Sequence, residues 1–145
     1  MGIDVNYIGP FLFTQQIVPF LKKSNSGRII NMASQVAQLT QLSNMNSPLK
    51  DDVCAAYQSS KIAVLGMTVL FAKELEHLGI KVNACCPGWV DTAMNSDVLP
   101  EYIDEHGHTI TAKTPEQGAD TPVWLATMDN CPTAGFFNER QAIDW

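Results

Sequence analysis

Hydrophobic residues recur along this chain in two alternating patterns. In residues 5–23 and again in residues 51–78, apolar side chains return every three or four positions, which predicts two helices. Two short apolar runs with β-branched residues, 28–34 and 80–86, follow these segments and open after glycine. Runs of this kind are typical of buried strands in a parallel sheet. The pattern therefore predicts the order helix, strand, helix, strand.

A third helix and a last strand continue this order. Residues 114–117 offer a capping threonine, a proline at the first helical position and an acidic first turn, which predict a helix start. Residues 135–137 form a short apolar run after a turn, which predicts a strand. The polar stretches 35–50 and 91–113 are predicted to be loops. Helices that alternate with strands indicate an α/β fold, here one half of a doubly wound parallel sheet.

Composition and charge argue against several classes of protein and of binding partner. The chain has 145 residues, enough for one domain at most. Its net charge of -6 and pI near 4.8 argue against nucleic acid or an anionic membrane as a partner. The longest nearly apolar run, residues 62–72, is too short to cross a bilayer, and no signal-peptide pattern opens the chain. The four cysteines lack a Cys-x-x-Cys spacing, so we expect reduced, buried thiols in a cytoplasmic protein.

One pair of residues points to chemistry. Tyr57 and Lys61 are four positions apart in a predicted helix, so their side chains project from one face, one turn apart. The ammonium group favours phenolate, and we therefore expect the pKa of Tyr57 to lie below its ordinary value of about 10. Such a tyrosine can exchange a proton with a developing alkoxide near neutral pH. Taken alone, the spacing favours an amphipathic surface pair, because Tyr-x-x-x-Lys occurs by chance in many helices.

Two further positions have both a functional and a structural interpretation. Ser34 ends a predicted strand, and function in open α/β sheets collects at the carboxyl ends of strands. A serine there can also simply make a local turn bond. His106 and His108 have an alternating spacing, but without a third ligand they favour a solvated loop, so no metal site is predicted.

Four parts of the sequence, in this order and spacing, resemble the short-chain dehydrogenases/reductases. They are Asn6 in the first helix, Gly27-Arg28-Ile29-Ile30-Asn31-Met32-Ala33-Ser34, Tyr57-Gln58-Ser59-Ser60-Lys61, and Asn83-Ala84-Cys85-Cys86-Pro87-Gly88-Trp89-Val90. The last of these, with residues 114–123 and the Trp145 end, is similar to the NADPH-dependent carbonyl reductases of that family. The resemblance covers essentially the whole chain but only the C-terminal half of a family member.

The resemblance implies a catalytic role for four residues. Tyr57 would be the general acid/base that protonates the carbonyl oxygen as hydride arrives. Lys61 would lower the pKa of Tyr57 and hold the nicotinamide ribose hydroxyls. Ser34 would hydrogen-bond the substrate oxygen and stabilise its developing charge. Asn6 would hold a water that relays protons to Lys61.

The same resemblance implies the binding residues and the ligands. NADPH is the implied cofactor, and a small carbonyl compound is the implied substrate. The residues implied for the cofactor are Tyr57, Lys61, Pro87, Gly88, Val90 and Thr92. Those implied for the substrate are Ser34, Tyr57 and Trp89.

One part of the family pattern is missing from the sequence. Family members begin with a strand and a glycine-rich turn that holds the pyrophosphate at a helix N-terminus, and this chain has no Gly-x-Gly. Residues 1–145 are therefore expected to be a partial domain, the catalytic half without the dinucleotide-binding half. Strand 28–34 would then have a bare edge, open to self-association together with the neighbouring helices. Two hypotheses follow: a carbonyl reductase, or a catalytically silent remnant that acts through association.

Overall fold

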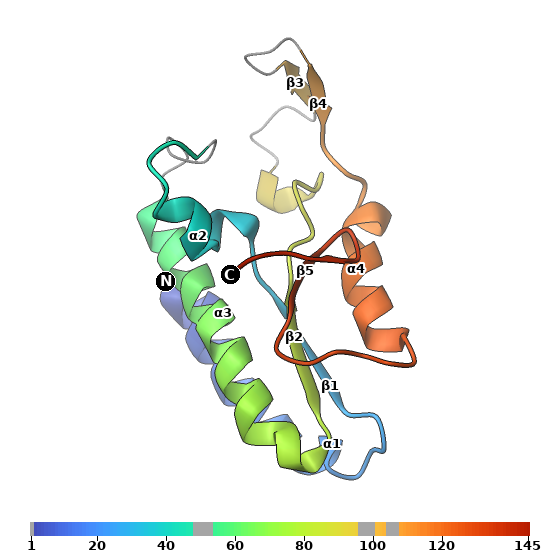
Figure 1. The fold of residues 1–145 in the computed structure, drawn as a ribbon. Helices are drawn as coiled ribbons and strands as arrows, with labels where there is room; N and C mark the ends of the chain where they lie inside the picture. The colour runs from blue at the N-terminus through green and yellow to red at the C-terminus, as the bar shows by residue number, and fades with distance from the viewer. Residues whose placement is uncertain (1, 48–53, 96–100, 104–107) are drawn as a thin grey trace.

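In the computed structural model, helices flank both faces of a small twisted sheet (Figure 1). The structure describes residues 2–47, 54–95, 101–103 and 108–145. Within these residues, no helix combines the length and the apolar composition that crossing a membrane requires. The chain thus has the layered α/β architecture that the alternating pattern predicts.

The main sheet contains four strands in the order β1-β2-β5-β6. They are β1 (Arg28–Met32), β2 (Lys81–Cys85), β5 (Phe136–Asn138) and β6 (Gln141–Ala142). The first three run parallel, as the buried apolar runs predict, while β6 turns back antiparallel to β5. The two-residue strand β6 carries no periodic signal, and the sequence does not predict it.

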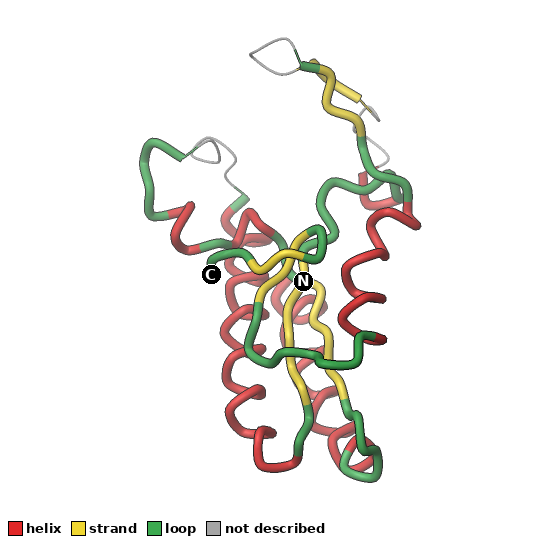
Figure 2. Tube along the Cα trace, turned by 45° about the vertical axis from the view of Figure 1, so that its right-hand side comes forward, coloured by secondary structure: helices red, strands yellow, loops and turns green. Residues whose placement is uncertain are grey.

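Three helices cover this sheet. The first begins as a π-helical turn, Asp4–Ile8, and continues as α1 (Gly9–Leu21). It lies beside α3 (Ala55–Leu75) on one face of the sheet, and α4 (Pro115–Thr127) covers the other face (Figures 1 and 2). A 3₁₀ turn, Glu76–Leu78, extends α3. All three helices are confirmed.

Local chemistry explains where two of these helices begin and end. Gly79 follows α3 with a φ of 69°, a left-handed conformation that glycine adopts without strain. Thr114 caps α4: its hydroxyl accepts from the backbone N–H of Gln117, whose side-chain oxygen accepts from the N–H of Thr114 at 2.8 Å. The helix start predicted at residues 114–117 is therefore confirmed, with a reciprocal cap.

Most buried apolar residues lie between the sheet and the α1–α3 face. Side chains of α3 pack onto β1 and β2, and aromatic residues of α1 pack against α3. The buried members of this cluster are Ile29, Ala33, Ala37, Val64, Leu65, Met67, Phe71, Ala72, Leu75, Ile80, Val82, Ala84, Cys86 and Phe136. This core holds the carboxyl ends of β1 and β2 in fixed positions.

The polar stretches contain more structure than predicted. Within residues 35–47, the structure contains a 3₁₀ turn, Gln35–Ala37, and the one-turn helix α2 (Leu39–Leu42). Residues 91–113 contain a 3₁₀ turn, Ala93–Asn95, and the hairpin strands β3 (Glu101–Ile103) and β4 (Thr109–Thr111). The loop predictions are wrong at these points because elements of three or four residues leave too short a period to recognise. His106 lies outside the described residues.

The cysteines differ in exposure. All four are free thiols; Cys85 and Cys86 are buried, while Cys54 is exposed, so the prediction of buried thiols is wrong for Cys54. Burial, together with the neighbouring Cys86, raises the pKa of Cys85 from 9.0 to about 12.

Cys85 is expected to make the fold sensitive to alkali. Its pKa is higher in the folded state, so this contribution is complete below pH 9 and is lost as the pH rises toward 12. In urea titrations over this range, Cys85→Ala should remove a component whose slope approaches about 1.4 kcal/mol per pH unit. Cys54→Ala is the matched control, and equal pH dependence in the two variants would contradict the prediction.

Candidate active site

The predicted site residues gather at the carboxyl ends of β1 and β2. The two strands are in register, with Met32 paired to Cys85, and the backbone N–H of Ala33 donates to the carbonyl of Cys85 at 2.8 Å. Ser34 follows β1 after one intervening residue, Ala33, and Pro87 follows β2 after one intervening residue, Cys86. Helix α3 packs on both strands, and its residue Lys61 donates to the carbonyl oxygen of Met32 at the end of β1. Parallel strands thus place segments distant in sequence beside one another.

Tyr57 and Ser34 are hydrogen-bonded to each other. Tyr57 lies in the first turn of α3 and is half-buried. Burial raises the pKa of Tyr57 above its ordinary value, and the hydrogen bond with Ser34 acts in the opposite direction. The phenol therefore stays protonated at neutral pH, and its hydrogen-bond partner is a hydroxyl group that follows β1.

Lys61 follows one helical turn later. Its Nζ atom lies 5.7 Å from the centroid of the Tyr57 ring and donates to the carbonyl oxygen of Met32 at 2.8 Å. Burial lowers the pKa of Lys61. The expectation that Lys61 lowers the pKa of Tyr57 is wrong for this structure, because burial of the phenol dominates and the ammonium group is bonded to a backbone carbonyl.

Asn6 reaches the same site through a residue that the sequence analysis did not single out. Its Nδ2 atom donates to the hydroxyl of Ser60 at 3.0 Å, and this hydroxyl donates to the backbone carbonyl of Tyr57 at 2.6 Å. Ser60 is completely buried. Its spacing of three residues from Tyr57 is the signal that could have indicated a shared helix face. The first helix is thereby tied to the turn of α3 that carries Tyr57.

Gly88 determines the backbone conformation of the loop that follows β2. Gly88 has a φ of 81°, and a Cβ added there would lie 3.0 Å from the Nζ atom of Lys113. Val90 forms an isolated bridge with Lys113 and is buried against Gly118 of α4. Cys86, just before Pro87, is near enough to affect the pKa values of both Tyr57 and Lys61.

The residues of this loop differ in accessibility. Pro87, Gly88 and Trp89 are partly exposed, and Thr92 is exposed. The loop therefore starts beside the site, and Thr92 further along it is exposed to solvent. Among the described residues, no group of three or more metal-binding side chains is present.

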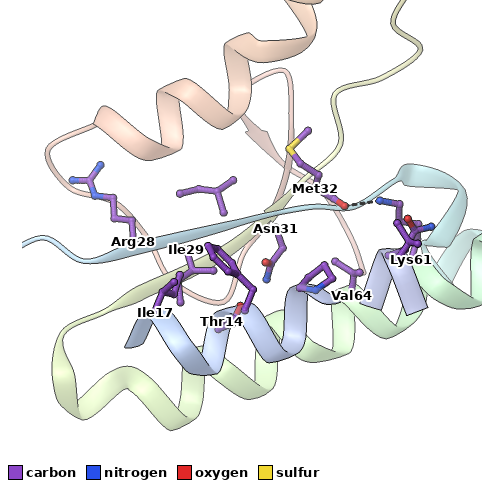
Figure 3. Close-up of a pocket in the computed structure, with 13 residues that line it drawn as sticks. Thr14, Ile17, Arg28, Ile29, Asn31, Met32, Lys61 and Val64 are labelled. Atoms are coloured by element: carbon purple, nitrogen blue, oxygen red, sulfur yellow. Dashed lines mark hydrogen bonds between the residues drawn. The ribbon is translucent and has the colours of Figure 1, made fainter. Parts of the chain in front are cut away.

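A pocket of about 580 Å³ opens beside Lys61, between α1 and β1 (Figure 3). Lys61 lies at one end of it and Arg28 and Ile17 lie toward the other, as Figure 3 shows. Asn6 also lines the pocket. The pocket is thus continuous with the end of the sheet that carries the site.

The hydrogen bond between Ser34 and Tyr57 gives a prediction about ionisation. Because this bond lowers the pKa of Tyr57, Ser34→Ala should move ionisation of the phenol to higher pH. Spectrophotometric titration of tyrosinate would measure the shift, with Tyr57→Phe identifying the contribution of Tyr57. Ser59→Ala, in the same turn but exposed, is the control. An unchanged or lower midpoint in Ser34→Ala would contradict the prediction.

Comparison with known proteins shows which family the chain is similar to. The family described as short chain dehydrogenase matches residues 2–102. The 3-oxoacyl-(acyl-carrier-protein) reductase FabG of Thermotoga maritima is 38% identical over 103 residues, which cover 71% of this chain and 37% of that protein. The (+)-neomenthol dehydrogenase of Arabidopsis thaliana is 29% identical, and its match covers 99% of this chain and 55% of that protein.

Solved structures agree with the sequence matches. The NADPH-bound carbonyl reductase from chicken fatty liver superposes with a TM-score of 0.74 at 21% identity, over 99% of this chain and 55% of that one; at this identity the likeness shows the fold. A short chain dehydrogenase from Salmonella enterica serovar Typhi gives 0.69 at 27% identity, over 93% and 50%. The doubly wound α/β fold is confirmed. The chain spans about half the length of these proteins or less, and it belongs to the short chain dehydrogenase family.

Proposed function

We propose that residues 1–145 are the catalytic half of an NADPH-dependent carbonyl reductase that converts a ketone, aldehyde or quinone to an alcohol. The observation that carries this proposal is the hydrogen-bonded pair of Ser34 and Tyr57, with Lys61 one helical turn away, at the carboxyl end of a parallel sheet. Family membership supports an oxidoreductase that uses a nicotinamide cofactor.

Three residues of the site have different proposed roles in the reduction. A reduced nicotinamide dinucleotide, when bound, supplies the hydride. Tyr57 donates its phenolic proton to the substrate oxygen, and its raised pKa keeps this proton available at neutral pH. Ser34 donates a hydrogen bond to the same oxygen and stabilises its developing negative charge. Lys61 supplies the positive charge next to Tyr57.

The described residues suit one end of the cofactor. The donors Lys61 and Tyr57 fit ribose hydroxyls, and the segment Pro87, Gly88, Val90 and Thr92 would bound the nicotinamide. Asn6, tied to Ser60, would support a proton relay to Lys61. The sequence contains no Gly-x-Gly for the pyrophosphate. The residues thus fit the nicotinamide end of the cofactor, and another segment must hold the rest.

Substrate choice would depend on the outer side of the site. Trp89 is proposed to line the substrate, next to the loop that follows β2. The relatives include a 3-oxoacyl-(acyl-carrier-protein) reductase and a (+)-neomenthol dehydrogenase, so the proposed reaction class admits several carbonyl substrates. The choice of NADPH over NADH rests on the resemblance to carbonyl reductases, one of which was solved with NADPH.

A completed chain would test the proposal. We define the completed chain as the part of the Thermotoga maritima reductase that precedes its match, joined ahead of residue 2 of this chain. It should oxidise NADPH in the presence of a ketone, an aldehyde or a quinone, as followed by the loss of NADPH absorbance. A folded completed chain that binds NADPH but reduces none of the three would contradict the proposal.

Exposed apolar side chains favour a second candidate, association with other chains. Leu12 and Phe20 on α1 are 53% and 68% exposed, and Leu70 on α3 is 67% exposed. We expect the isolated chain to self-associate, and Phe20→Asp should lower its apparent mass in light scattering at equal concentration. A monodisperse monomer with a sharp melt would contradict this expectation.

A further inference from the structure

Residues 143–145, the strap, run from β6 to the segment that follows Ser34. Figures 1 and 2 show this end of the chain, marked C, near α2. At the start of the strap, the backbone N–H of Ile143 donates to the carbonyl of Phe136 at 2.8 Å. At its end, the ring of Trp145 stacks on that of Phe136, with centroids 5.9 Å apart. Because Phe136 is a buried core residue, the strap is held on the core by both a backbone bond and a ring contact.

Hydrogen bonds join the strap to the segment after Ser34. The Nε2 atom of Gln38 donates to the carbonyl oxygen of Asp144 at 2.8 Å. The backbone N–H and the hydroxyl of Thr40 both donate to the backbone oxygen of Trp145, each at 3.1 Å. Thr40 lies in the first turn of α2, where backbone N–H groups have no partner inside the helix. The strap therefore supplies an acceptor that the start of α2 lacks.

Burial of Gln38 makes its bond to the strap costly to lose. Gln38 is only 7% exposed, so water has little access to its side-chain amide. A buried amide donor that loses its acceptor is destabilising, because water does not replace the lost partner. The positions of Gln38 and Asp144 are therefore coupled.

The same segment connects back to Ser34 through a tight turn. The N–H of Ala37 donates to the carbonyl of Ser34, and the N–H of Gln38 donates to that of Gln35, each at 3.0 Å. Ala37 is fully buried, and the turn packs on α3, the helix that carries Tyr57. Because these bonds join both residues in one turn, a shift of Gln38 reaches Ser34.

We propose that the strap is a positioning element of the active site, which fixes the turn after Ser34 and thereby holds the Ser34 hydroxyl against the Tyr57 phenol. Its catalytic consequence rests on the proposed function. The hydrogen bond between Ser34 and Tyr57 belongs to the chain itself, however, and can be measured without catalysis. Gln38, Thr40 and Trp145 are positioning residues, since each acts through Ser34.

Backbone hydrogen exchange of the isolated chain tests whether the strap holds the turn. Trp145→Ala removes the stacked ring, and Gln38→Met removes the amide donor while keeping an unbranched side chain. In both variants the N–H of Ala37 should exchange about fivefold faster, the size expected for loss of one hydrogen bond. The N–H of Gly79, bonded in the turn at the far end of α3, is the internal control and should not change.

Spectrophotometric titration of Tyr57 distinguishes positioning from a contribution to stability alone. If the strap holds Ser34 in place, Trp145→Ala and Gln38→Met should raise the midpoint of Tyr57, the direction expected for Ser34→Ala. In double variants with Ser34→Ala, neither substitution should add a further shift, because both act through the same hydroxyl.

Two further variants serve as controls for the titration. Trp145→Phe keeps an aromatic ring on the core and should restore both the exchange rate and the midpoint. Ser43→Ala, exposed at the end of α2 and outside the bonds to the strap, should change neither. Titratable groups near the phenol include Cys54, Cys86 and Lys61, which lie outside the strap, so all the variants keep them.

In the completed chain the same substitutions should act on turnover. Trp145→Ala and Gln38→Met should each lower kcat by about tenfold, since a displaced Ser34 stabilises the transition state less well. KM and NADPH binding should stay nearly unchanged, because the strap has no contact with the loop that begins at Pro87 in the proposed cofactor site.

Two outcomes would overturn the proposal. An Ala37 N–H that stays equally protected in both variants would show that the strap does not hold the turn. Faster exchange with an unchanged Tyr57 midpoint would make the strap a structural contact only. Gln38→Met decides both points if Trp145→Ala does not fold. A completed chain that is inactive while the midpoint still responds to the strap would support the positioning role and contradict the proposed reductase.

Discussion

Replacing Tyr57 with phenylalanine in the completed chain is expected to lower turnover by roughly 10²–10⁴-fold, the usual contribution of a general acid. The variant keeps the aromatic ring against Lys61 and loses only the hydroxyl that donates the proton. Initial rates of NADPH oxidation at saturating carbonyl substrate would measure the loss.

A control variant distinguishes loss of the proton donor from an effect of the substitution on folding. Tyr7→Phe is the matched control, because Tyr7 packs on Phe11 in the α1 layer and takes no part in the proposed site. NADPH binding should persist in both variants. Turnover of Tyr57→Phe equal to that of Tyr7→Phe would remove Tyr57 from the mechanism.

Removing the dinucleotide-binding half should abolish cofactor binding altogether. The isolated chain offers Lys61, Tyr57 and the loop from Pro87 to the nicotinamide end, but it has no glycine-rich turn for the pyrophosphate. We expect no measurable NADPH binding at micromolar concentrations and no reductase activity from the isolated chain.

Fluorescence titration of NADPH would check this expectation, with the completed chain as the positive control. Binding by the isolated chain at the same concentrations, and competition by excess NADP⁺, would show that the cradle for the pyrophosphate lies in this half after all.

The order of helices and parallel strands could be predicted because each element leaves a pattern long enough to recognise. The buried runs that became β1 and β2 open after glycine, and α4 begins with a recognisable cap at Thr114. The hairpin strands β3 and β4 could not be predicted, since three residues do not define a period. Strand β6 could not be predicted for the same reason, since it has only two residues.

The candidate site was only partly predictable. Helical spacing places Lys61 beside Tyr57, and the end of β1 places Ser34 beside Tyr57. The pKa of Tyr57 was predicted in the wrong direction, because the effect of burial depends on packing around the ring and cannot be read from spacing. The partner of Lys61 is a backbone carbonyl, Met32, which has no signature in side-chain sequence.

The most direct test of the account is isotope transfer in the completed chain. With NADPH carrying deuterium at the transferable C4 position and a prochiral ketone as substrate, the product alcohol should carry one deuterium at the carbinol carbon. Mass spectrometry of the product decides the matter: alcohol formed without deuterium, or NADPH consumed with no alcohol formed, would contradict the claim that this chain is the catalytic half of a carbonyl reductase.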